Sequence, residues 1–251
     1  MKFAITPCPN DTFSYYALAN GLIKNGFEFV FDDIEALNLA AETGKYPVTK
    51  MSFAAFLKNR ERYELLDAGA ALGLGTGPIL VAREGTQFDH SKPVAVPGLN
   101  TTGAQLLKYY AGCNLTLVPM HFREIADAVK SGAVDAGVLI HEGRFVFSSM
   151  GLKLVADLGG YWTEKTQLPV PLGCICIRKD KADKKERVEN LIRQSVLAAF
   201  EDPQATYPYV KKYAQYLDDA VLRQHIYAFV NEYSKDISSI REKLLENLEK
   251  C

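Results

Sequence analysis

Short apolar runs alternate along this chain with segments whose apolar residues recur every three or four positions. The runs predict β-strands, and the longer spacing predicts amphipathic helices. Predicted strands cover residues 3–6, 27–31, 48–52, 79–83, 94–96, 115–118, 134–140, 152–155 and 172–177. Predicted helices lie between most of these strands, and the chain after residue 178 is expected to be helical. This alternation predicts an α/β fold.

The order of the elements predicts two lobes. We expect residues 1–86 together with 177–251 to form a discontinuous α/β lobe, and residues 87–176 to form an inserted second lobe. Each lobe is predicted to be a mainly parallel sheet flanked by helices. The glycine-rich segment 73–77 lacks the Gly-Lys-Ser/Thr ending of a phosphate loop, so we interpret it as a crossing between lobes. Such a clamp binds ligands in its cleft and closes on a hinge.

Polar residues gather where predicted strands end and predicted helices begin, which is where open α/β sheets bind ligands. Helix N-termini there suit a carboxylate or another anion. Asp11 is expected to cap a helix rather than to contact the ligand. The predicted cleft positions are Asn10, Asp11, Thr12, Ser52, Thr76, Thr101, Thr102, Gly103 and His141.

The stretch from Val134 to Arg144 carries the strongest indication of chemistry. An apolar run leads directly into His141, Glu142 and Gly143. An imidazole changes charge near neutral pH, so His141 is a candidate general base. The alternative is a strand-end histidine held by a structural hydrogen bond. Glu142 is one candidate to orient the ring, although successive strand residues point to opposite faces.

Composition narrows the class of protein. The chain has 251 residues, of which 48% are hydrophobic and 24% charged, with a net charge of −1. These values are typical of a globular protein and give no general attraction to nucleic acid or anionic membranes. No apolar window reaches the ~20 residues of a membrane span. We therefore expect a small-molecule carboxylate as partner, no nucleic acid, no membrane, and a monomer or small homo-oligomer.

The cysteines fit no disulfide or metal framework. They are five in number and scattered, and the pair at 174 and 176 has only one residue between them. Neither a zinc knuckle nor a thioredoxin-type motif matches this spacing. The start of the chain has no apolar run long enough for a signal peptide. We expect a cytoplasmic protein with reduced thiols, no metal ligands and no cofactor.

Five motifs in order give the chain a family resemblance. They are Pro7-Cys8-Pro9-Asn10-Asp11-Thr12-Phe13, Val48-Thr49-Lys50-Met51-Ser52, Pro97-Gly98-Leu99-Asn100-Thr101-Thr102, Ile140-His141-Glu142-Gly143-Arg144 and Leu168-Pro169-Val170-Pro171-Leu172-Gly173. Together they resemble the 1,4-dihydroxy-6-naphthoate synthase family, which acts on cyclic dehypoxanthine futalosine in the futalosine pathway to menaquinone. The resemblance implies a type II periplasmic-binding-protein fold and a lyase that needs no cofactor.

The resemblance also implies roles for particular residues. His141 would be the catalytic base. Substrate contacts would come from Lys50, Met51, Ser52, Thr102 and Gly103, and Asn38 would be a further polar cleft residue. Two positions depart from the pattern that we expect of the family: Gly103 replaces an alanine and Leu74 an arginine. The second departure bears on substrate preference.

The chemistry agrees with these residues. A substrate with an acidic C–H beside a carbonyl, and with a carbon substituent that can leave, needs a base that is neutral near pH 7. The expected reaction is proton abstraction followed by carbon–carbon cleavage. Two alternatives remain: a cytosolic binding protein or sensor for a small carboxylate, and a sister enzyme that resembles chorismate dehydratase.

Overall fold

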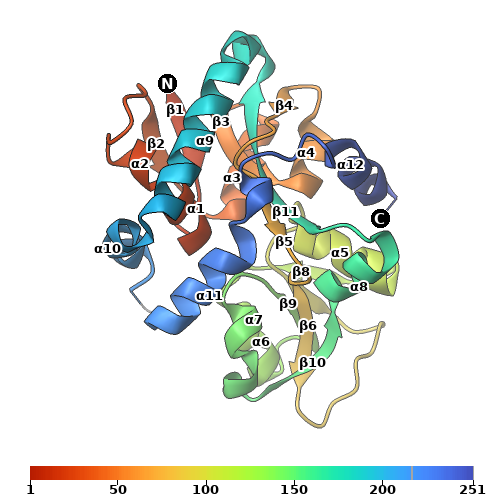
Figure 1. Ribbon diagram of the computed structural model, residues 1–251. Coiled ribbons are helices and arrows are strands. Elements are labelled where there is room, and N and C mark those ends of the chain that lie inside the picture. The colour runs from red at the N-terminus through yellow and green to blue at the C-terminus, as the bar shows by residue number, and fades with distance from the viewer. Residues whose placement is uncertain (216, 251) are drawn as a thin grey trace.

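The computed structural model describes residues 1–215 and 217–250 and contains two β-sheets flanked by helices (Figure 1). The expectation of a reduced thiol at Cys251 lies outside the described residues. The first sheet has the order β2-β1-β3-β11-β4, and β5 pairs with another part of β11. Its strands are β1 (Lys2–Ile5), β2 (Glu28–Phe31), β3 (Val48–Ser52), β4 (Tyr63–Leu65), β5 (Ala71–Gly73) and β11 (Val170–Arg178).

The second sheet is formed by the middle of the chain and has the order β10-β6-β9-β7-β8. Its strands are β6 (Ile79–Arg83), β7 (Val94–Val96), β8 (Leu117–Pro119), β9 (Ala136–Leu139) and β10 (Leu152–Asp157). The strand β6 pairs with β9 and β10, so the prediction that Ile79–Arg83 belongs to the first lobe is wrong. The chain changes sheet before β6, in the glycine-rich segment.

Helices cover both sheets. They are α1 (Pro9–Ser14), α2 (Tyr16–Ala19), α3 (Ile34–Glu42), α4 (Phe53–Asn59), α5 (Thr102–Ala111), α6 (Ile125–Ser131), α7 (Gly143–Val146), α8 (Leu158–Thr166), α9 (Lys185–Glu201), α10 (Pro203–Tyr213), α11 (Asp219–Phe229) and α12 (Arg241–Glu249). The C-terminal helices α9, α10 and α11 pack against α1, and α12 packs against α4. The helical prediction for the chain after residue 178 is confirmed.

Each sheet is mixed rather than mainly parallel. In the first sheet β1 pairs parallel with β2 and β3, but β11 runs antiparallel to its neighbours. In the second sheet β7 pairs parallel with β8 and β9, whereas β6 is antiparallel to β9 and β10. The antiparallel ladders arise where the chain crosses between sheets, because a strand that returns beside an outgoing one runs in the opposite direction.

The two crossings between the sheets run side by side. Gly73 pairs with Val170 on one side of the crossing, and Ile79 pairs with Asp157 on the other. Between them, Gly77 lies so close to Gly159 that a Cβ at residue 159 would come within 2.8 Å of the Gly77 Cα. The glycines of this segment therefore allow the two backbones to approach, as expected for a crossing.

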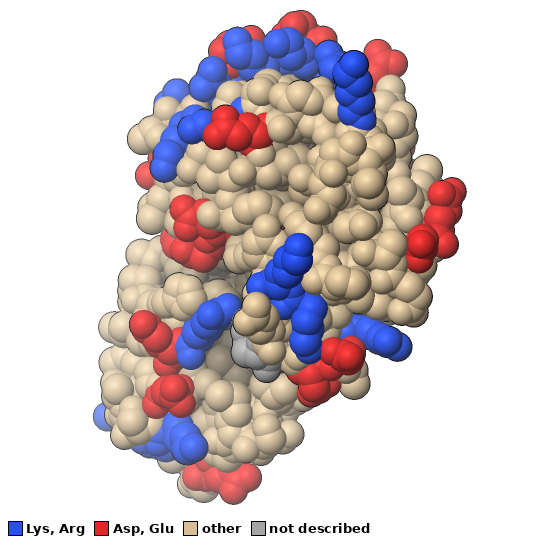
Figure 2. Space-filling model, turned by 90° about the vertical axis from the view of Figure 1, so that its left-hand side faces the viewer, with Lys and Arg blue, Asp and Glu red and all other residues tan. Residues whose placement is uncertain are grey.

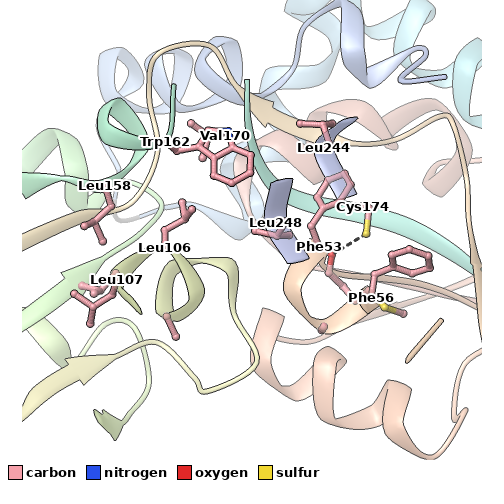
Figure 3. Packing of buried hydrophobic residues seen from close by; sticks show 14 of the residues in the cluster. Phe53, Phe56, Leu106, Leu107, Leu158, Trp162, Val170, Cys174, Leu244 and Leu248 are labelled. Carbon is pink, nitrogen blue, oxygen red and sulfur yellow. Dashed lines mark hydrogen bonds between the residues drawn. The ribbon is translucent and has the colours of Figure 1, made fainter. Parts of the chain in front are cut away.

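One hydrophobic cluster extends through both halves of the molecule. Figure 3 shows Phe53 and Cys174 on the side of the first sheet and Leu106 and Leu158 on the side of the second. Trp162 is fully buried within the same cluster, and its indole N–H donates to the Pro169 carbonyl at 3.0 Å. This shared core fixes the relative position of the sheets in this conformation.

The surface carries charge of both signs. Figure 2 shows basic and acidic side chains interspersed over one face of the molecule. Within residues 1–215 and 217–250, no helix is both long enough and apolar enough to span a membrane.

Candidate active site

A narrow cavity of about 70 Å³ lies between the two sheets. Its wall combines the ends of strands and the starts of helices from both sheets with one residue of α11. The lining residues are Thr6, Asn10, Ile34, Lys50, Ser52, Ala71, Gly77, Pro78, Thr101, Thr102, Gly103, Ile140, His141, Leu172, Gly173 and Phe229. Of the twelve residues that the sequence placed in the cleft, seven are among them: His141, Lys50, Ser52, Thr101, Thr102, Gly103 and Asn10.

His141 follows β9 and lines the cavity in an unusual backbone conformation. Its φ is +54°, in the left-handed region that a non-glycine residue rarely adopts. The Cys8 Sγ lies 3.5 Å from the ring Nδ1 and 3.8 Å from Nε2, and the Phe122 ring packs edge-on with centroids 4.9 Å apart. Cys8, rather than Glu142, therefore makes the contact to a ring nitrogen.

Partial burial favours the neutral form of His141. Desolvation lowers the pKa of the imidazole below its ordinary value, the carboxylate of Glu142 opposes this, and Lys50 adds to the lowering. Burial also raises the pKa of the Cys8 thiol to about 12, so at neutral pH Cys8 is an S–H group. A neutral imidazole beside a neutral thiol is the protonation state that a general base requires.

Lys50 and Asp11 form an ion pair at the base of the cavity. The two residues are only 5% and 2% exposed. The Asp11 carboxylate also accepts from the Thr6 N–H at 3.1 Å, from the Thr6 hydroxyl at 2.6 Å and from the Asn10 amide at 2.9 Å. The prediction that Asp11 caps a helix is wrong: Cys8 occupies the N-cap position of α1, and Asp11 lies within the helix with its carboxylate turned to Lys50.

A glycine leaves room for this lysine. A Cβ at Gly173 would lie 2.7 Å from the Lys50 Cε, closer than non-bonded carbons approach. Gly173 pairs with Ser52 on the neighbouring strand β3, so the backbone of β11 passes directly beside the lysine side chain. The position therefore needs a residue without a side chain while Lys50 stays paired with Asp11.

Ser52 is held in place by Asn38, which lies behind it. The Ser52 N–H donates to the Asn38 side-chain oxygen at 2.9 Å, and the Asn38 amide donates to the Ser52 Oγ at 3.2 Å and to Glu35 at 2.9 Å. Glu35 in turn accepts from the backbone N–H and the side chain of Asn100, both at 3.1 Å. Asn38 is thus a support for the cavity wall rather than part of it, and Glu35 links α3 to the turn before α5.

The start of α5 faces the cavity with free backbone amides. Thr101 is its N-cap and accepts from the Ala104 N–H at 3.2 Å. The Thr102 hydroxyl accepts from the Ala54 N–H at 3.4 Å and donates to the Leu172 carbonyl at 3.2 Å. Among the described residues no acceptor is found for the Thr102 and Gly103 N–H groups, so they are available to an anion at the helix N-terminus.

Five predicted site residues lie outside this cavity wall: Asp11 and Thr12, which belong to α1, and Asn38, Met51 and Thr76. Asn38 lies behind Ser52. Met51 is fully buried in the hydrophobic core, because its neighbours Lys50 and Ser52 point to the cavity and alternate strand residues point to opposite faces. Thr76 lines a separate open hollow with Leu74 and Arg223, near the crossing between the sheets.

Arg144 braces the crossing instead of entering the cavity. Its guanidinium donates to both carboxylate oxygens of Asp157 at 2.9 and 2.6 Å, and to the Gly77 carbonyl at 2.9 Å. This bidentate pair lowers the pKa of Asp157, although burial of that carboxyl works in the other direction. The arginine that ends the sequence motif around His141 therefore has a structural partner.

Two contributors to the site were not anticipated from the sequence. Phe229 lines the cavity, and His225 lies parallel to His141 with ring centroids 5.8 Å apart. Both belong to α11, more than fifty residues beyond the last sequence motif. Nothing in the local sequence marks them, because only the packing of α11 against α1 brings them to the cavity.

Comparison with other proteins defines the class first. The chain has a periplasmic-binding-protein-like fold, shared with the ligand-binding component of an ABC-type import system from Staphylococcus aureus. Those two structures superpose with a TM-score of 0.71 at 13% identity, covering 100% of this chain and 90% of the other. At this identity the likeness concerns the fold alone.

The family follows from the sequence. The model of a family described as "Menaquinone biosynthesis" matches residues 1–251. A 1,4-dihydroxy-6-naphthoate synthase from Thermus thermophilus is 39% identical over 251 residues, 99% of this chain and 92% of that protein. The crystal structure of AF1704 from Archaeoglobus fulgidus superposes with a TM-score of 0.93 at 35% identity, covering 99% and 95% of the two chains. The chain belongs to this menaquinone biosynthesis family of enzymes.

Proposed function

We propose that this chain is a cofactor-independent carbon–carbon lyase that forms 1,4-dihydroxy-6-naphthoate from cyclic dehypoxanthine futalosine. The proposal rests on one observation above all: a histidine whose pKa is lowered by burial lines a cavity beside a cationic side chain and two free helix amides. The family and the naphthoate synthases that resemble this chain supply the substrate class.

The substrate carboxylate would bind where positive potential is concentrated. The N–H groups of Thr102 and Gly103 point from the start of α5, and Ser52 presents its hydroxyl across the cavity. Lys50 also lines the cavity, although its charge is partly balanced by Asp11. Hydrogen bonds of these kinds to a charged group are worth roughly 1.5–3 kcal/mol each.

The reaction then needs only a base and an anion-stabilising wall. His141 would take the proton from the carbon next to the substrate carbonyl, leaving an enolate. As the carbonyl re-forms, the electron pair of the enolate C=C moves into a new double bond to the adjacent carbon, and the bond from that carbon to the leaving carbon breaks. The leaving fragment departs with the pair of the broken bond and takes a proton. Backbone amides and hydroxyls stabilise the charge that develops on oxygen.

The test is turnover of cyclic dehypoxanthine futalosine, with the naphthoate product followed by its absorbance after chromatographic separation. His141→Asn removes the base and keeps much of the size of the side chain, so kcat should fall by about a hundredfold or more. Substrate affinity and melting temperature should change little. His121→Asn is the matched control, because His121 is exposed and lies outside the cavity.

A binding protein on the same fold would behave differently. The fold admits this second candidate, because the ligand-binding component of an ABC-type import system shares it. It would bind a small carboxylate but convert none, and His141→Asn would alter affinity without any turnover to lose. If the wild-type protein converts the substrate and the His141→Asn variant does so at the same rate, the activity stands but His141 is not the base.

A further inference from the structure

His225 is a buried histidine whose protonation is dictated by its neighbours. It lies on α11 with none of its surface exposed, and its Nε2 is 3.0 Å from the Asn10 Oδ1. The Asn10 amide nitrogen must face Asp11, because an ionised carboxylate only accepts. The Asn10 oxygen therefore faces His225, and Nε2 carries the proton that it accepts.

The second ring nitrogen of His225 is consequently an acceptor. Among the described residues Nδ1 of His225 has no hydrogen-bond partner, although it is buried. Protonating it would place a buried N–H where no acceptor is found, which costs free energy. Burial, with His141 and Lys50 nearby, holds the pKa of His225 well below its ordinary value. His225 is a neutral aromatic ring with a fixed tautomer.

This neutral ring lies parallel to the imidazole of His141. The two imidazoles are nearly parallel, with an interplanar angle of 11° and centroids 5.8 Å apart. His141 needs such support, because a non-glycine residue at positive φ persists only where its surroundings enforce the conformation. Phe122 packs against the ring edge-on, Cys8 contacts its nitrogens, and His225 adds an offset parallel ring from α11.

We propose that His225 is a positioning residue for His141, supporting the face of the base from α11 and excluding water from it. The proposal rests on the proposed function, in which His141 is the base. Asn10, through Asp11 and Lys50, fixes the His225 ring and so connects the ion pair of the first sheet to the base that follows β9 of the second sheet.

The effect on His141 is one of solvation more than of charge. The titratable and charged groups around its ring are Cys8, Asp11, Lys50, Arg123, Glu142 and His225. Since His225 is neutral, removing it changes no charge in this set. Opening the face of His141 to water weakens the desolvation that lowers its pKa, so the pKa should rise toward its ordinary value.

Three variants separate the ring from its hydrogen bond. His225→Ala removes both, His225→Phe keeps an aromatic face without the hydrogen bond, and His225→Gln keeps a donor for Asn10 without the ring. Ile226→Val is the control for disturbance of α11, because Ile226 is buried in a different cluster, away from the cavity. Each variant is measured for kcat, KM, melting temperature and the His141 titration by NMR of the 15N-histidine-labelled protein.

We expect His225→Ala and His225→Gln to raise the pKa of His141 and to lower kcat by about tenfold to a hundredfold with little change in KM, as for a misplaced base. His225→Phe should restore most of kcat and a low pKa at His141 despite a lower melting temperature. The opposite pattern, in which Gln rescues and Phe does not, would overturn the proposal. So would a His141 titration that is the same in all variants.

The titration keeps this inference separate from the proposed function. It needs no substrate, so it reports on the contact between the two histidines even if the wild-type protein does not convert cyclic dehypoxanthine futalosine. In that case the proposed activity is refuted. The pKa of His141 in the His225→Ala, His225→Gln and His225→Phe variants then decides by itself whether the His225 ring shields His141.

Discussion

The buried ion pair at the base of the cavity gives a prediction whose size can be worked from its hydrogen bonds. Asp11 accepts four: its Oδ1 from Asn10 and Lys50, and its Oδ2 from the backbone and hydroxyl of Thr6. In Asp11→Asn one of these oxygens becomes an NH₂ group. Whichever way the new amide is oriented, two donors lose their acceptor and the Lys50 charge loses its counter-charge.

The cost follows from these losses. Hydrogen bonds to a charged group contribute roughly 1.5–3 kcal/mol each, and breaking a buried ion pair costs about 3–5 kcal/mol. Since both side chains are nearly inaccessible to water, solvent relieves little of this. We expect Asp11→Asn to lower the free energy of unfolding by about 3–5 kcal/mol, measured by urea unfolding at pH 7 and linear extrapolation.

Two further variants make the measurement specific. Asp33→Asn is a matched control: Asp33 caps α3 through the N–H groups of Glu35 and Ala36, and asparagine caps a helix about as well as aspartate does. Adding Lys50→Met to Asp11→Asn removes the unpaired charge, so the two changes should couple by about 1–3 kcal/mol. A loss below about 1 kcal/mol for Asp11→Asn, or additive effects in the double variant, would show that the pair contributes no more than an exposed one.

Four other substitutions and one pH profile test the cavity and its histidines. Ser52→Ala and Thr102→Val should each weaken substrate binding by roughly 1.5–3 kcal/mol, measured as KM or Kd. Thr102→Val should also lower the melting temperature, because the Thr102 hydroxyl is hydrogen-bonded to Leu172 and Ala54. Unchanged binding in either variant would exclude that hydroxyl from substrate contact. Gly173→Ala should displace Lys50, raising KM and lowering the free energy of unfolding by about 1–3 kcal/mol. A variant with normal KM and melting temperature would contradict the close approach of the Gly173 backbone to the Lys50 side chain. Because the pKa of His225 is lowered in the folded protein, the unfolded chain binds more protons than the folded one just below pH 6.5. The free energy of unfolding should therefore fall as the pH drops from there, by up to about 1.4 kcal/mol per pH unit. His225→Phe should flatten this slope in melting curves between pH 7.5 and 5.5. The acid limb of kcat/KM should likewise lie below about pH 6.5, because desolvation lowers the pKa of His141. A limb above that value would contradict a neutral base.

The sequence by itself determined the local elements and the polar positions at their ends. The α/β class follows from the alternation of apolar runs and amphipathic segments, and most predicted strands appear where the pattern places them. Lys50, Ser52, Thr102, Gly103 and His141 reach one cavity because strand ends and helix starts of both sheets face the space between them. The glycines of the crossing were also recognisable, since they allow two backbones to approach.

Only the tertiary structure decided which strands pair and which distant groups meet. Val170–Arg178 and Ile79–Arg83 are both apolar strands, and nothing in their composition tells that β11 belongs to the first sheet and β6 to the second. Aspartate is a common helix-capping residue, but Asp11 instead forms a buried ion pair with Lys50, thirty-nine residues later in the chain. His225 and Phe229 enter the site through the packing of α11. Periodicity reports burial and local conformation, whereas these contacts depend on non-local packing that no local pattern encodes.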